Sequence, residues 1–254
     1  MKTTRIYLAL ILTFFSTYSI YAGYKLAILK DPDGFSNVRN GPGNDFLIVD
    51  TLYTDDFLYF QFIENSEWAK ISAWKGRQIE GFIQLNKIQE VEKLENKIQQ
   101  ELIAKILNTR NKLKADFVDF QKSKDSLAYI NCLSELKFYS DTKLEPILEI
   151  LPRYICSTQD TKILKLFFAS YWADKGSLNE MPSLTMASFF ICNPDLVIKQ
   201  LNKINSIEQK KSILNHIYWG LINYYGIEEN GKTNNKEYNK HRARLDTEIK
   251  KINP

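Results

Sequence analysis

The apolar pattern of this chain changes at about Val91, and that change limits the possible folds more than any other feature. Before it, short runs of β-branched and aromatic residues alternate with turn signals such as Asp31-Pro32-Asp33-Gly34. After it, apolar residues recur every three or four positions, which is the period of a helix. The 254 residues are enough for two such cores. The sequence therefore predicts a small all-β barrel or sandwich followed by an all-α domain.

The first two dozen residues carry a separate signal. Lys2 and Arg5 precede the apolar run from Ile6 to Phe15, and a more polar stretch then ends at small residues around Ala22. These are the three regions of a secretory signal peptide. A retained membrane anchor is the alternative, but polar residues interrupt the run before the roughly 20 apolar positions that a span needs. We therefore expect cleavage after residues 1–22 and export to the periplasm or the medium.

The first half of the remaining chain leaves no room for a helix between its turn signals. We predict short strands over residues 27–29, 37–39, 46–49, 57–62, 68–74 and 81–85. The expected organisation is a barrel over residues 23–91, a connecting helix over 92–122 and a helical domain over 123–254.

Several residues of these strands and turns form an ordered set. The first block is N-V-R-x-G-P, the second places Trp three positions before an apolar residue, and the third is Gly followed by an aromatic residue and an apolar one. The residues concerned are Asn37, Val38, Arg39, Gly41, Pro42, Trp68, Ile71, Gly81 and Phe82. On these residues the segment resembles the bacterial SH3 (SH3b) family, with Phe82 standing where the family usually has Trp and Ser36 replacing the usual leading apolar residue. The resemblance implies an SH3-like barrel.

The resemblance also implies binding rather than catalysis, with peptidoglycan or its peptide bridges as the ligand. Gly41-Pro42 is expected to fix a turn, and Trp68 and Phe82 are expected in the barrel core. Arg39 is expected to hold a carboxylate, either of a neighbouring acidic side chain, which we favour, or of a ligand. Three amphipathic aromatic residues complete the candidate ligand site: Tyr53, Tyr59 and Trp74.

The charge of the chain is nearly balanced. Without residues 1–22 it has 32 Lys and Arg against 30 Asp and Glu. Residues 23–90 carry seven basic and ten acidic residues, and residues 91–254 carry 25 and 20. No dense basic patch of the kind that binds nucleic acid is present, and no later run reaches 18 apolar residues. We therefore expect neither a nucleic-acid partner nor, after cleavage, a membrane partner.

The second half reads as a series of helices. Apolar spacing between residues 91 and 120 predicts one long helix or two consecutive ones. A core-facing stripe in a bundle is favoured over a coiled-coil dimer, whose seam is imperfect at Thr109-Arg110. Thr142-x-x-Glu145 is predicted to be a capping box, and Asn193 and Ser206 are predicted N-caps. Further helices are expected over 125–138, 160–172, 186–191, 207–221 and 238–252. A helical hairpin array and a compact bundle both fit this spacing.

The three cysteines lie in the second half, at positions 132, 156 and 192. Each has apolar neighbours, so free thiols in the core are favoured over a bridge, although an oxidising compartment permits one pair. Cys192 and His216 are the one Cys-His pair in a plausible order, and both fall in helical sequence. We expect His216 to be partly buried and His241 to be solvated. No metal, nucleotide or catalytic motif is present, so we expect no cofactor and no enzyme activity.

Together these observations favour an exported, non-enzymatic protein of the cell envelope. Its barrel would bind peptidoglycan or a peptide, and its helical domain would serve as a surface for a protein partner. The alternative is an inhibitor or immunity-type protein whose helical domain binds a secreted protein while the barrel acts as a scaffold.

Overall fold

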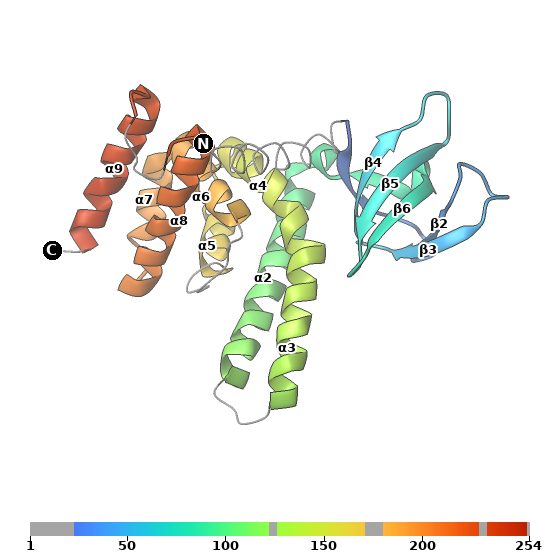
Figure 1. Cartoon of the computed structure of the whole chain (residues 1–254), viewed down its shortest axis with the longest axis horizontal. Helices are drawn as coiled ribbons and strands as arrows, with labels where there is room; N and C mark the ends of the chain where they lie inside the picture. The colour runs from blue at the N-terminus through green and yellow to red at the C-terminus, as the bar shows by residue number, and fades with distance from the viewer. Residues whose placement is uncertain (1–22, 122–125, 171–179, 229–232, 253–254) are drawn as a thin grey trace, which may run out of the picture. The chain divides into compact units, whose positions relative to one another are not determined.

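A computed structural model of the chain describes residues 23–121, 126–170, 180–228 and 233–252. The predicted signal peptide lies outside these residues, as does Trp172. The chain divides between Leu94 and Glu95 into two compact units. The first contains the strands and the second contains the long helices (Figure 1). The prediction of a β half followed by an α half is confirmed.

The first unit is one antiparallel sheet of seven strands in the order β3-β2-β6-β5-β4-β1-β7. Two short 3-10 turns, η1 (Leu85–Lys87) and η2 (Val91–Lys93), flank the last strand. In the pairings of the described residues β3 and β7 remain the two edges, so hydrogen bonds do not close the sheet. The strands are β1 (Lys25–Leu29), β2 (Phe35–Arg39), β3 (Ile48–Tyr53), β4 (Phe57–Phe62), β5 (Trp68–Trp74), β6 (Gln78–Gln84) and β7 (Ile88–Glu90).

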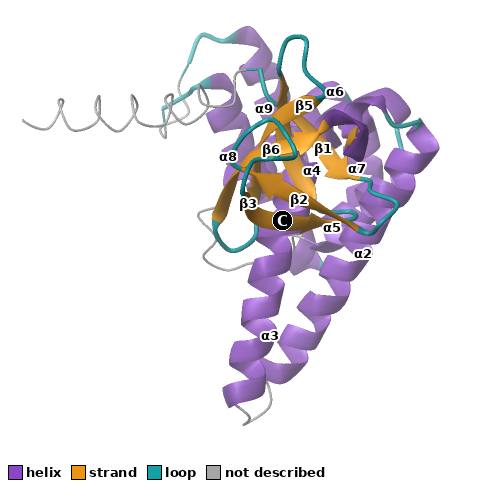
Figure 2. Ribbon diagram, turned by 90° about the vertical axis from the view of Figure 1, so that its right-hand side faces the viewer, coloured by secondary structure: helices purple, strands orange, loops and turns teal. Residues whose placement is uncertain are grey.

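The strands, orange in Figure 2, form a bent sheet. The buried side chains of the sheet form one apolar core. The core includes Leu52 of the edge strand β3 together with Ala27 and Leu29 of β1, near the other edge. The turn after β3 also reaches the end of β1, because Leu29 N donates to the Asp56 carbonyl at 2.9 Å and Asp55 N donates to the Leu29 carbonyl at 3.0 Å. Residues that alternate with the core residues therefore face outward around a strongly curved surface.

The second unit contains the helices. A π-helical turn, η3 (Ser140–Leu144), joins the second and the third of the helices given next. The helices are α2 (Asn96–Gln121), α3 (Ser126–Tyr139), α4 (Glu145–Thr158), α5 (Thr161–Ser170), α6 (Glu180–Cys192), α7 (Pro194–Leu201), α8 (Ile207–Tyr225) and α9 (Lys236–Ile252).

The helices pack in a chain of neighbours. α2 and α3 lie side by side as a long hairpin (Figure 1), and α2 also contacts α5. A second series of contacts runs from α4 to α6, α8 and α9. At the centre α6 and α8 approach so closely that a Cβ on Gly220 would collide with the backbone of Ser183. The large buried aromatic residues Phe167 and Phe189 pack edge to face, with ring centroids 5.3 Å apart.

Two of the three predicted helix N-termini are confirmed, and one is wrong. Asn193 and Ser206 are N-caps as predicted, since their side chains accept hydrogen bonds from Leu196 N and Gln209 N. The capping box at Thr142 is wrong. The chain continues from α3 through η3 into α4 without an N-cap there, and Thr142 Oγ1 donates back to the Phe138 carbonyl at 2.7 Å.

Cys156 and Cys192 form a disulfide that joins α4 to α6, with Cα atoms 5.9 Å apart. The expectation of free thiols is therefore wrong for these two residues and holds for Cys132, which is free and buried. The sequence could not select the pair, because it does not show that the C-terminal ends of α4 and α6 meet.

Candidate functional site

The four candidate ligand residues all lie on the outward face of the sheet. Arg39, Tyr53, Tyr59 and Trp74 each follow or precede a core residue within a strand, so their side chains point away from the core. They are not brought together as one site. Tyr59 pairs across the sheet with Leu26 and Ser72, whereas Arg39 pairs with Phe82.

Arg39 forms a hydrogen bond within the sheet unit. Its Nη1 donates to the Phe46 carbonyl at 2.6 Å, across the loop that joins β2 to β3. The contact is intramolecular, as favoured from the sequence, but the acceptor is a backbone carbonyl instead of a carboxylate. The ring of Phe46 covers Gly41 so closely that a Cβ at Gly41 would overlap it. Arg39, Gly41 and Phe46 together fix the shape of this loop.

Tyr53 lies close to Lys75, the residue that follows Trp74. The Nζ of Lys75, which directly follows Trp74, lies 4.7 Å from the centroid of the Tyr53 ring. Phe35 is the cross-strand partner of Tyr53. The exposed fractions of Phe35, Tyr53 and Trp74 are 45%, 56% and 48%. We call these three aromatic residues, together with Lys75, the aromatic patch.

Phe35 was not among the ligand residues predicted from the sequence. The alternation along β2 could have indicated it, because Phe35, Asn37 and Arg39 alternate with Ser36 and Val38, which are both buried. Alternation would have placed Phe35 on the same face as Arg39. The prediction that Trp68 and Phe82 lie in the core is wrong. They alternate with the core residues and are half-buried on the outward face.

The edge of β3 beside the patch is protected by side chains. Asp50 Oδ1 accepts from Thr51 N at 2.8 Å, and Asp56 Oδ2 accepts from Tyr53 N at 2.9 Å. Lys75 Nζ donates to the Thr51 carbonyl at 2.9 Å. Backbone groups that an added strand would need are therefore already engaged. The patch can recognise a ligand through its aromatic faces and not by strand addition at these residues.

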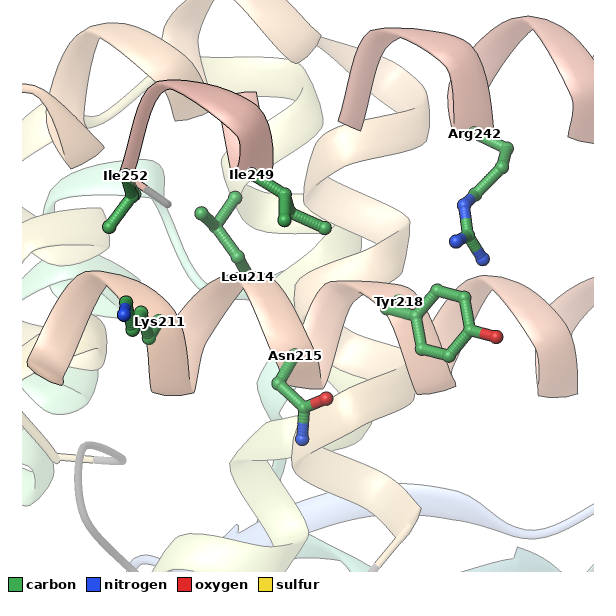
Figure 3. Close-up of a pocket in the computed structure, with 7 residues that line it drawn as sticks. All are labelled: Lys211, Leu214, Asn215, Tyr218, Arg242, Ile249 and Ile252. Atoms are coloured by element: carbon green, nitrogen blue, oxygen red, sulfur yellow. The ribbon is translucent and has the colours of Figure 1, made fainter. Parts of the chain in front are cut away.

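The helical unit holds a pocket that sequence reasoning missed (Figure 3). It has a volume of about 380 Å³ and is formed by one face of α8 and one face of α9. Arg242 stacks on Tyr218, with its Cζ 4.0 Å from the ring centroid, and its Nε donates to Asp246 at 2.8 Å. The remaining lining residues are Lys211, Leu214, Asn215, Ile249 and Ile252. The apolar stripe of α9 was visible in the sequence, but nothing there indicated that α8 and α9 leave space between them.

The two histidines and Cys192 lie where helices contact one another. His216 Nδ1 lies 2.8 Å from Ser183 Oγ, which links α8 to α6. Cys192 is in the disulfide and so has no thiol for a Cys-His pair. His241 was expected to be solvated, but it is only 7% exposed and lies against Phe190 and Tyr225. Among the described residues no group of three or more His, Cys, Asp or Glu could hold a metal ion.

Within the described ranges no single helix is long and apolar enough to cross a membrane. One bent pair, Met181–Cys192 and Pro194–Leu201, passes the length and composition test with an angle of 115° between its parts. No protein-family model, no curated protein and no solved structure matches this chain.

Proposed function

We propose that this chain is an exported, non-enzymatic binding protein of the bacterial cell envelope. In this proposal the sheet unit is an SH3b-type module that binds peptidoglycan or a peptide, and the helical unit offers a surface to a protein partner. The observation that carries the proposal is the aromatic patch, in which three large aromatic side chains of one small sheet are about half exposed. Exposed aromatic clusters of this kind are typical of binding surfaces.

The residues that resemble the SH3b family have roles that support the module. Gly81 lies where β2 crosses β6, and a Cβ there would come within 2.5 Å of the Arg39 carbonyl oxygen. Arg39 and Gly41 fix the β2–β3 loop through Phe46. A strongly bent sheet with one core is also what an SH3-like barrel requires.

The chemistry of the aromatic patch suits a sugar or peptide ligand. The flat faces of Tyr53, Phe35 and Trp74 can stack on a sugar ring or on a peptide plane. The ammonium group of Lys75, which lies over the Tyr53 ring, can pair with a carboxylate of such a ligand. None of these interactions requires a catalytic group.

Two observations support export. The N-terminal pattern of Lys2 and Arg5, an apolar run and small residues is that of a signal peptide. The Cys156–Cys192 disulfide is suited to an oxidising compartment outside the cytoplasm.

The test is co-sedimentation of residues 23–254 with purified sacculi. We expect saturable binding that the double variant Tyr53→Ala/Trp74→Ala weakens by about tenfold or more, because truncated aromatic residues at the centre of a binding surface carry much of its free energy. Phe62→Ala is the matched control. Phe62 is an exposed aromatic residue of the same sheet, but it pairs with Ala69 near the start of β5, whereas Trp74 ends that strand.

The outcomes separate the possibilities. Equal loss in the double variant and in Phe62→Ala would place the site elsewhere on the sheet. No binding to sacculi by the unmodified protein would overturn the peptidoglycan ligand and leave a peptide as the ligand to be tested.

The alternative, an inhibitor or immunity-type protein, is favoured by one surface of the helical unit. α3 buries Cys132 and Leu136 on one face, yet Ile130, Leu133 and Phe138 are exposed on the rest of the helix. A helix with apolar residues on both faces suits contact with a second partner. Absence of binding both to sacculi and to peptides would give this alternative precedence.

A further inference from the structure

We propose that the pocket between α8 and α9 binds an anionic amphiphile, namely a single medium-length alkyl chain that ends in a carboxylate. This site is independent of the aromatic patch, because it is built entirely from the helical unit. It therefore adds a second ligand to the proposed envelope function and does not depend on it.

The shape of the pocket is that of a short groove. Lys211, Leu214 and Tyr218 are spaced by three and four residues and so share one face of α8 (Figure 3). Seven residues of helix correspond to a length of about 10 Å between Lys211 and Tyr218. The volume of about 380 Å³ lies within the range of pockets that hold small organic ligands.

The middle of the groove is apolar. Ile249 of α9 faces Leu214 of α8 in Figure 3, and Ile252 extends the apolar wall toward the Lys211 end. An alkyl chain lying between these side chains would lose its contact with water, which is the main driving force for binding apolar groups. A small inorganic anion would make no use of this wall.

The two ends of the groove differ in charge. At one end Arg242 is already engaged, since it stacks on Tyr218 and is paired with Asp246. At the other end Lys211 is exposed, and the structure records no ion pair for it within the described residues. Asn215 adds amide hydrogen-bonding groups one turn further along. The carboxylate is therefore assigned to the Lys211 end and the chain to the Leu214–Ile249 wall.

The test uses residues 23–254 and three probes of equal chain length: decanoate, decanol and decyltrimethylammonium, each below its micellar concentration. Isothermal titration calorimetry measures each affinity. We expect decanoate to bind at one site, more tightly than decanol, and the cationic probe not to bind. Octanoate should bind about tenfold more weakly than decanoate, because two buried methylenes are lost.

Two substitutions locate the site. Lys211→Met keeps the apolar stem but removes the charge, and it should weaken decanoate binding by about two- to fivefold while leaving decanol binding unchanged. Lys250→Met makes the same change in charge on α9, at an exposed residue that does not line the pocket, and should leave both affinities unchanged. Ile249→Ser should weaken both probes, whereas Ile207→Ser, at an exposed apolar residue of α8 outside the pocket, should weaken neither.

The proposal fails if decanoate does not bind, if the three probes bind equally, or if the two lysine variants behave alike. Thermal unfolding of each variant shows whether it is folded. These results do not depend on sacculus binding, so failure of the pocket proposal and failure of the envelope proposal can be distinguished.

Discussion

At the scale of single residues, Gly81 shows how the bent sheet limits side-chain size. β2 crosses β6 at Gly81, and a Cβ there would lie 2.5 Å from both the Arg39 carbonyl oxygen and Val38 Cγ1. Val38 is fully buried, so it has little space into which it can move. The backbone of β2 would have to shift instead.

We predict that Gly81→Ala lowers the free energy of unfolding of the sheet unit by about 1–3 kcal/mol, the usual cost of overpacking. Urea denaturation followed by tryptophan fluorescence measures the change. Gly43→Ala is the matched control. Its Cβ would meet only the ring of Phe46, at 3.2 Å, and that ring is 46% exposed and so less confined than Val38. A Gly81→Ala protein as stable as the control would contradict this account of the crossing.

At the scale of elements, α9 is attached to the helical unit largely through buried residues that include His241. The imidazole ring lies 6.4 Å from the Tyr225 ring of α8, nearly parallel to it, and 6.1 Å from the Phe190 ring of α6. Burial lowers the pKa of His241 below the usual value of 6.5, because the packed surroundings disfavour the charged imidazolium.

Three charged groups near His241 add to this environment. Lys240 and Arg244 lower the pKa of His241 further, and Glu237 opposes them. Burial is the largest of these effects. The neutral ring is therefore the form that suits the packing of α9 against α6 and α8.

We predict that acid weakens the attachment of α9. Above pH 6.5 the ring is neutral in both the folded and unfolded chain, so its contribution to stability is fully present. As the pH falls below 6.5 the unfolded chain binds the proton first, and stability is lost until the pH passes the lower pKa of the folded form. His241→Phe should remove this part of the pH dependence, measured as the urea midpoint between pH 7.5 and pH 5. A variant whose pH profile matches that of the unmodified protein would refute the role of His241.

At the scale of the whole molecule, the chain consists of two units that each have a core of their own. All three cysteines lie in the helical unit, and the disulfide closes a loop of 36 residues between α4 and α6. The sheet unit has no covalent crosslink to lose. Reduction should therefore affect the two units differently.

We predict two thermal transitions, of which only that of the helical unit falls on reduction. Cys156→Ser/Cys192→Ser removes a constraint on the unfolded chain that is worth about 4 kcal/mol for a loop of this length, which corresponds to a fall of roughly 10 °C in Tm. Differential scanning calorimetry with and without a reducing agent measures both transitions. Cys132→Ala, at the free thiol, is the control for the effect of reduction. Equal shifts in both transitions would show that the units do not unfold independently.

Much of the local structure could be predicted from the sequence. The bounds of β4 and β5 agree with their aromatic and β-branched runs, and Asn193 and Ser206 are caps as expected. These features depend on interactions within a few residues, which the sequence displays directly. β3 was placed too early, because the exposed run from Phe46 to Val49 resembles a buried strand while the polar Asp50 and Thr51 within β3 do not.

The order of the two units, the change from strand to helix periodicity and the positions of most elements could be predicted from the residues alone, because these features follow from the local spacing of apolar and turn residues. The pairing of Cys156 with Cys192, the burial of His241, the position of Phe35 opposite Tyr53 and the pocket between α8 and α9 become visible only in the folded structure. Each of these depends on which faces of distant elements meet. That is set by the packing of the whole core, which local spacing does not encode.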